Sequence, residues 1–174
     1  MVNETLWHSS RLLHSNKVIS AKEPDKSAKG AKQEGLKILV AEDGVLQQAL
    51  VSLLLKRMGH TVTMVGDGFE AVTAVQVVDY DVLLIDCQMP LMNGIDATRF
   101  IRQIYRSSKR KRDLIIIGIT TSSSSEECFE SGMDYFLHKP LKKPILEAVL
   151  GRLKRDILQT RRSLERGLSS TFSD

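Results

Sequence analysis

Residues 81–94 read DVLLIDCQMPLMNG, an almost wholly apolar run that ends in Asp86 and continues into a loop. A run of this length and composition is typical of a strand that is buried on both faces of a parallel sheet. Pro90, Asn93 and Gly94 break the pattern, and a helical pattern begins at Ile95. The stretch therefore predicts one strand–loop–helix unit, with Asp86 at the carboxyl end of its strand.

Similar units flank this one on both sides. Strand-length runs occupy residues 37–41, 60–65, 114–120 and 135–137, and helical patterns follow at 45–58, from 68 onward, at about 125–131 and from 144 to about 162. Strands that alternate with helices in this way predict an α/β fold. We expect a flavodoxin-like, doubly wound parallel sheet of five strands in the order 2-1-3-4-5, with helices on both faces.

The helix predicted over residues 45–58 has two apolar arcs. The arc that should face the sheet comprises Leu50, Val51, Leu54 and Met58. The second arc comprises Val45, Ala49 and Leu53. It should be exposed, unless a neighbouring element or the N-terminal segment covers it. In the next helix, an inward face is predicted from the spacing of Phe69, Val72 and Val75.

Composition excludes several classes of protein. The 174 residues are 42% hydrophobic and 26% charged, as in soluble globular proteins. No apolar run approaches the roughly 20 residues of a membrane span, and no signal peptide is visible, which favours the cytosol or the nucleus. Cys87 and Cys128 are far apart in the sequence, which argues against a disulfide or zinc site and leaves Cys87 as a small buried residue without a redox role. The basic runs at 106–112 and 142–166 lack interleaved aromatic residues, so we expect no nucleic-acid binding.

The chain length fits one domain with flanking segments. Residues 1–35 are rich in Ser, Lys, Glu and Gly without periodicity, which predicts a disordered polar and basic arm. The domain should occupy residues 36–160, and residues 161–174 read as a flexible tail that is too short for an output domain. We expect a monomer.

Polar residues follow four of the predicted strands at their carboxyl ends, where ligands bind in such sheets. They are Glu42 and Asp43, then Asp86, Thr120 and Lys139. Each alone is typical of a loop, a cap or a surface position, but neighbouring carboxylates repel unless a cation lies among them. Oxygen ligands favour Mg²⁺. An aspartate beside that ion can attack phosphorus to form an aspartyl phosphate, with the hydroxyl and the ammonium contacting the phosphoryl oxygens.

The stretches KILVAEDG, DVLLIDCQMPLMNGIDATRFIRQ, IIGITT and GMDYFLHKPL, in this order over residues 37–158, closely resemble the receiver domain of two-component systems, especially of eukaryotic hybrid histidine kinases. The resemblance implies that Asp86 is the phosphoacceptor of a histidine-to-aspartate phosphorelay. It also implies that Mg²⁺ is bound by Glu42, Asp43, Asp86 and the backbone carbonyl of Gln88. Thr120 and Phe136 would be switch residues, and Lys139 would contact the phosphoryl group.

The resemblance also implies a partner, either a histidine-phosphotransfer protein or a sensor histidine kinase, and a cis bond between Lys139 and Pro140. We expect the second arc of the first helix to dock on that partner's helical bundle. Gly44, Asn93 and Thr121 depart from the usual pattern, and the stretch 120–132 is about one helical turn shorter than is usual, so the fourth helix should be short.

The protein implied is a signalling domain, either alone or within a hybrid kinase, which catalyses only its own phosphotransfer and dephosphorylation. Two alternatives remain. One is a scaffold that is not phosphorylated, against which the acceptor, hydroxyl and lysine argue. The other is an aspartate-nucleophile phosphatase, but Asp86-Cys87-Gln88 lacks the second aspartate of that class.

Overall fold

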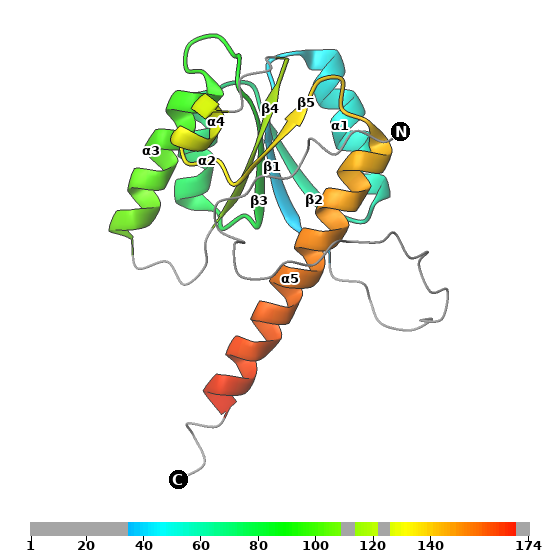
Figure 1. Ribbon diagram of the computed structural model, residues 1–174, viewed down its shortest axis with the longest axis vertical. Coiled ribbons are helices and arrows are strands. Elements are labelled where there is room, and N and C mark those ends of the chain that lie inside the picture. Colours follow the sequence, from blue (N-terminus) through cyan, green and yellow to red (C-terminus); the bar gives the residue numbers. More distant parts are fainter. Residues whose placement is uncertain (1–34, 109–113, 122–125, 170–174) are drawn as a thin grey trace.

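The computed structural model of the protein describes residues 35–108, 114–121 and 126–169, with side chains described as far as residue 163. Five strands form one parallel sheet in the order β2-β1-β3-β4-β5, as the sequence predicts (Figure 1). The strands are β1 Lys37–Ala41, β2 Thr61–Val65, β3 Val82–Asp86, β4 Ile115–Thr120 and β5 Tyr135–His138. The predicted arm over residues 1–35 lies, apart from Gly35, outside the described residues.

Helices cover both faces of the sheet (Figure 1). They are α1 Val45–Arg57, α2 Gly68–Val77, α3 Gly94–Ser107, α4 Glu126–Glu130 and α5 Lys143–Ser169. Alternate residues of a strand point to opposite faces, so Ile38 and Val40 pack with α1 and α5, whereas Leu39 and Ala41 pack with α2, α3 and α4. The predicted α/β fold is confirmed, and α4 is as short as expected, with 5 residues.

Local sequence explains how α2 and α3 begin. Asp67 accepts a hydrogen bond from the backbone N–H of Glu70 at 2.8 Å, and Asn93 accepts one from that of Asp96 at 2.8 Å. Such N-caps satisfy backbone donors that the first helical turn leaves without partners. At the start of α3 the residue must also be small, because a Cβ on Gly94 would lie 2.1 Å from the carbonyl oxygen of Asp86. The third helix therefore begins directly against the backbone of the central acidic residue.

The last helix is longer than the sequence indicates. We predicted its end near residue 162, but α5 continues to Ser169. Arg161 forms an ion pair with Asp81, which precedes β3, and the other oxygen of Asp81 accepts a hydrogen bond from the backbone N–H of Lys37 at 2.8 Å. This tertiary contact anchors α5 to the sheet at Arg161, and residues 161–169 belong to the helix rather than to the predicted tail.

Two predicted helix faces were also partly wrong. Leu50 is 60% exposed, and the buried residues of α1 are Val51 and Leu55. Phe69 is 54% exposed, while Ala71 and Val75 face the core. The other predicted residues, Val51, Leu54 and Met58 of α1 and Val72 and Val75 of α2, do pack in the core, so only Leu50 and Phe69 were misplaced.

Candidate functional site

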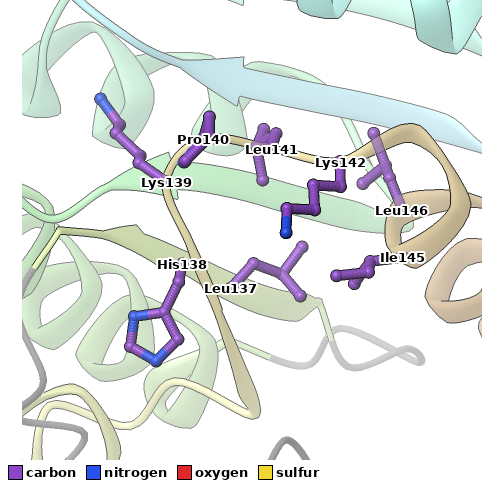
Figure 2. Close-up of a pocket in the computed structure, with 8 residues that line it drawn as sticks. All are labelled: Leu137, His138, Lys139, Pro140, Leu141, Lys142, Ile145 and Leu146. Carbon is purple, nitrogen blue, oxygen red and sulfur yellow. The ribbon is translucent and has the colours of Figure 1, made fainter. Parts of the chain in front are cut away.

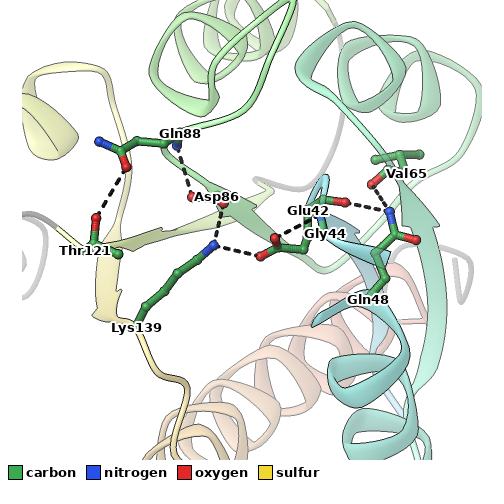
Figure 3. Close-up of polar contacts among 8 residues, drawn as sticks. All are labelled: Glu42, Gly44, Gln48, Val65, Asp86, Gln88, Thr121 and Lys139. Atoms are coloured by element: carbon green, nitrogen blue, oxygen red, sulfur yellow. Dashed lines mark hydrogen bonds and ion pairs between the residues drawn. The ribbon is translucent and has the colours of Figure 1, made fainter. Parts of the chain in front are cut away.

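Three carboxylates gather at the carboxyl edge of the sheet, and Figure 3 shows two of them, Glu42 and Asp86. Glu42 and Asp43 follow β1, and Asp86 ends the neighbouring strand β3. One oxygen atom from each of the three lies within 4.8 Å of the others. Glu42 and Asp86 are buried and Asp43 is exposed. The parallel sheet thus brings together acidic residues that are more than 40 positions apart in the sequence.

Lys139 reaches this cluster from the loop after β5. Its Nζ lies 3.0 Å from Oε2 of Glu42 and 2.5 Å from Oδ2 of Asp86. Burial alone would lower the pKa of Lys139, but the hydrogen bonds to Asp86 and then Glu42 outweigh it and raise that pKa above its ordinary value. The lysine is therefore cationic. The predicted cis bond between Lys139 and Pro140 is present, and the backbone N–H of Lys139 donates to the carbonyl of Thr120 at 2.9 Å.

The charges at the cluster do not balance. Three carboxylates against one ammonium leave two negative charges, at a place where two of the acids are buried. A divalent cation would compensate this excess, and the donors are all oxygens, the kind that Mg²⁺ prefers. The second oxygen of Asp86 accepts a hydrogen bond from the backbone N–H of Gln88 at 3.0 Å, which orients the carboxylate. The residues present therefore fit a hard divalent ion.

Gln48 of α1 holds the acidic loop in place, and sequence reasoning missed it. Its Nε2 donates to the carbonyl oxygen of Glu42 at 2.5 Å and to that of Val65 at 3.4 Å, while the backbone N–H of Glu42 donates to the same Val65 carbonyl at 3.2 Å (Figure 3). Glu42 Oε1 in turn accepts from the backbone N–H of Gly44 at 3.2 Å. A glutamine in a helix carries no sequence signal for this role, because only the packing of α1 turns it toward the loop.

The predicted switch residues lie on the neighbouring strands β4 and β5. Thr120 is buried at the end of β4. Phe136 of β5 is partly buried and lies edge-on to Phe129 of α4, with ring centroids 5.3 Å apart, and to His138 at 5.4 Å. The Phe136 ring therefore packs against the short helix α4.

Thr121 and Gln88 make a further polar contact at the edge of the site. The hydroxyl of Thr121 donates to Oε1 of Gln88 at 3.3 Å (Figure 3). The two residues follow Thr120 and Asp86 closely in the sequence, so this hydrogen bond joins the loops after β3 and β4 beside the central carboxylate.

A hollow of about 240 Å³ lies beside the cluster at the junction of β5 and α5 (Figure 2). Its apolar lining comes from Leu137, Leu141, Ile145 and Leu146, and Lys142 also lines it. Figure 2 shows the Lys139 side chain directed away from these residues. The hollow and the carboxylate cluster are therefore separate features on either side of one loop.

The predicted exposed arc of α1 is present and larger than expected. Val45 is 81% exposed and Leu53 is 51% exposed, and Ala49 is also exposed. Leu46 and Leu50 add to the same helix surface, at 70% and 60% exposure. An apolar helix surface of this kind begins immediately beside the acidic loop.

The two cysteines are free and buried, as the sequence predicts for Cys87, but they lie next to each other. Cys87 and Cys128 are 41 positions apart, but their Sγ atoms lie 3.6 Å from each other. Both are buried, and burial, followed by the neighbouring Cys128, raises the pKa of the Cys87 thiol. The fold places α4 over the end of β3, which their separation in the sequence could not indicate.

Comparisons with known proteins point to one family. The model of the response regulator receiver domain family matches residues 38–150. Hybrid signal transduction histidine kinase B of Dictyostelium discoideum is 37% identical over 116 residues, which is 61% of this chain and 6% of that protein. Histidine kinase 1 of Arabidopsis thaliana is 32% identical over 162 residues, which is 73% of this chain and 13% of that protein. The chain thus spans a small part of these relatives.

Solved structures show the same fold. The receiver domain of a sensor histidine kinase of Pseudomonas aeruginosa, with a magnesium ion coordinated in its active site cleft, has a TM-score of 0.62 and 33% identity, over 70% of this chain and 98% of that one. A receiver domain from Saccharomyces cerevisiae, solved with a histidine phosphotransfer protein, has a TM-score of 0.62 and 26% identity, over 67% of this chain and 86% of that one. Among the described residues, no helix is both long and apolar enough to cross a membrane.

Proposed function

Because the chain belongs to the response regulator receiver domain family, we propose that it accepts a phosphoryl group on Asp86 in a histidine-to-aspartate phosphorelay. The observation that carries this proposal is the buried carboxylate of Asp86, hydrogen-bonded to Lys139 inside a cluster of three carboxylates. The receiver unit would occupy residues 36–160. The family is one of signalling domains, and the chemistry proposed is limited to the chain's own phosphorylation and dephosphorylation.

The reaction follows from the positions of the side chains. A carboxylate oxygen of Asp86 would attack the phosphorus of the donor, forming an O–P bond as the P–N bond of the phosphohistidine breaks. Glu42, Asp43, Asp86 and the backbone carbonyl of Gln88 would hold Mg²⁺, which when bound neutralises charge on the phosphoryl oxygens. The ammonium of Lys139 would exchange its contact with the carboxylate for one with a phosphoryl oxygen, and the hydroxyl of Thr120 would donate to another.

The signal would leave the site as a shift between two conformations. The phosphoryl group would attract Thr120. The movement of Thr120 would leave a space into which Phe136 can move. Phe136 contacts Phe129 of α4, so its displacement would be transmitted to that helix. Phe136 has no hydroxyl to form a new hydrogen bond outside, and we expect a weaker bias between the two states than a tyrosine would give.

A direct test is incubation of the protein with acetyl phosphate and Mg²⁺. The wild type should form a covalent adduct that is stable in acid and labile in base, and Asp86→Asn should form none. Omission of the divalent ion should abolish labelling of the wild type, because the cluster would otherwise hold uncompensated charge. Labelling of Asp86→Asn would refute the assignment. A correctly folded wild type that never labels would instead favour the alternative of a scaffold.

The docking surface would be the exposed arc of α1, formed by Val45, Ala49 and Leu53. A phosphotransfer protein presents its histidine on a helical bundle, and helix-on-helix contact here would bring that histidine in line with Asp86. The complex of the yeast receiver domain with its phosphotransfer protein supports a partner of this class. The protein would act as a monomer in the cytosol or the nucleus, without binding nucleic acid or inserting into a membrane.

Leu53→Glu tests the docking surface. We expect transfer from a phosphotransfer protein to fall about 30-fold or more, as for a central interface residue, while labelling by acetyl phosphate stays near that of the wild type. Thr63→Glu, at an exposed position of β2, is a control that should change neither reaction. Equal losses in both reactions would mean that Leu53→Glu damages the fold, and no loss in either would place docking on another surface.

A further inference from the structure

Cys87 and Cys128 form a pair of thiols beside the phosphoacceptor that the proposed phosphotransfer does not use. Cys87 directly follows Asp86, and Cys128 lies in α4. Their sulfur atoms are 3.6 Å apart, and the side chains are 6% and 2% exposed. Two thiols at this separation are in van der Waals contact, with no other side chain between them.

We propose that Cys87 and Cys128 are a modification site, at which a small disulfide or a peroxide oxidises the pair to an intramolecular disulfide. Each thiol loses its hydrogen, and a bond forms between the two sulfur atoms. The two electrons and two protons reduce the small disulfide to two thiols, or hydrogen peroxide to two water molecules. Excess thiol reverses the reaction.

The geometry requires only a small movement. The sulfur atoms must approach from 3.6 Å to about 2.05 Å, the length of a disulfide bond. Cys87 is held by the sheet, since its backbone N–H donates to the carbonyl of Ile119 at 2.8 Å. Cys128 belongs to a helix of 5 residues, so the movement falls on α4 rather than on β3.

The residues around the pair explain why oxidation would affect the site. Asp86 precedes Cys87, and the carbonyl of Cys87 accepts a hydrogen bond from Gly94, where α3 begins. Phe129 follows Cys128 and contacts Phe136. A disulfide would therefore tether the loop that carries the phosphoacceptor to the helix that contacts the switch aromatic residue. This consequence rests on the proposed function, whereas formation of the disulfide does not.

The disulfide is tested by counting thiols in the full chain. The protein is incubated with oxidised glutathione, quenched in acid, denatured, alkylated and weighed by mass spectrometry. We expect the wild type to lose two hydrogen atoms and to take up no alkyl group, and to take up two after treatment with dithiothreitol. Cys87→Ala and Cys128→Ala should each keep one cysteine that cannot close an intramolecular bond. Two alkylated cysteines in the oxidised wild type, or glutathione adducts in place of the lost hydrogens, would overturn the proposal.

The effect of the disulfide on the phosphoacceptor site is tested by the initial rate of labelling with acetyl phosphate. Oxidation should slow labelling of the wild type. It should leave the labelling rate of Cys128→Ala unchanged, since that variant keeps Asp86 but cannot close the intramolecular disulfide. A disulfide that forms without changing the rate would overturn the link to the phosphoacceptor. A wild type that forms the disulfide but never labels would contradict the proposed function and leave the modification site standing.

Discussion

The two edges of the sheet handle buried charge in opposite ways. At the amino edge, Asp134 accepts hydrogen bonds from Arg102 at 2.5 Å and from the backbone N–H of Ile116 at 2.8 Å, and Asp81 is paired with Arg161. Each of these two acids has its own arginine. At the carboxyl edge three acids gather, and one lysine pairs with two of them, Glu42 and Asp86. Paired charges hold structural elements together, whereas an excess of one charge is stable only with a ligand. The balance of charge therefore distinguishes the amino edge, which has a structural role, from the carboxyl edge, which has the functional one.

The largest expected effect comes from the same substitution made at both edges. Asp134→Asn removes a carboxylate that faces an arginine and should lower the free energy of unfolding by about 2–3 kcal/mol. Asp86→Asn removes one of three mutually repelling acids and should leave stability unchanged or raise it when no divalent ion is present. Urea unfolding in EDTA measures both variants. Equal losses of stability in the two variants would contradict the difference in charge balance between the two edges.

An intermediate effect is expected from the glutamine that holds the acidic loop. Gln48→Met keeps the length of the side chain but cannot donate to the carbonyl of Glu42, so the carboxylates should be less well oriented for a metal ion. We expect Mg²⁺ to bind about 10-fold more weakly by calorimetry, with the unfolding midpoint in EDTA little changed. Gln47→Met, at an exposed position of the same helix, is the matched control and should bind Mg²⁺ like the wild type. Unchanged affinity in Gln48→Met would show that the loop is ordered without this contact.

The smallest effect concerns a histidine at the amino edge. Nδ1 of His60 accepts a hydrogen bond from the backbone N–H of Leu36 at 3.1 Å, which requires the neutral ring. Burial, and then the charge of Lys154, lower the pKa of His60 below its ordinary value. The folded state therefore binds fewer protons than the unfolded chain. The stability from this contact is complete above about pH 6.5, the pKa of an unfolded histidine, and is lost as the pH falls through the lower folded value.

The measurement is the free energy of unfolding of the wild type and of His60→Gln at several pH values. The difference between the two should be constant above about pH 6.5 and should shrink in more acidic solution. A difference that does not vary with pH would mean that His60 does not titrate with folding.

Most of the fold and the members of the candidate site could be predicted from the sequence, because both depend on short-range patterns. Apolar runs of strand length, helical periodicity and the order of the units require a parallel sheet, and a parallel sheet brings all its carboxyl ends to one edge. Asp86 ends a strand, and Glu42 and Lys139 directly follow strands, so their meeting follows from topology alone. Asp67 and Asn93 begin their helices through contacts with residues three positions away.

Other features were decided only by the tertiary structure. The inward arcs of α1 and α2 depended on how the helices pack, which a helical wheel cannot choose when apolar residues surround much of the helix, and Leu50 and Phe69 were therefore misplaced. The ion pair that anchors α5 to the sheet joins Arg161 and Asp81, which are 80 positions apart. Likewise, the orientation of Gln48 and the contact between Cys87 and Cys128 arise where separate units meet. The sequence determined which residues lie at each edge of the sheet, because the order of the strands and the periodicity of the helices are local patterns. Which side chains touch was decided by packing between segments that are far apart in the chain, because separation in the sequence does not indicate distance in space.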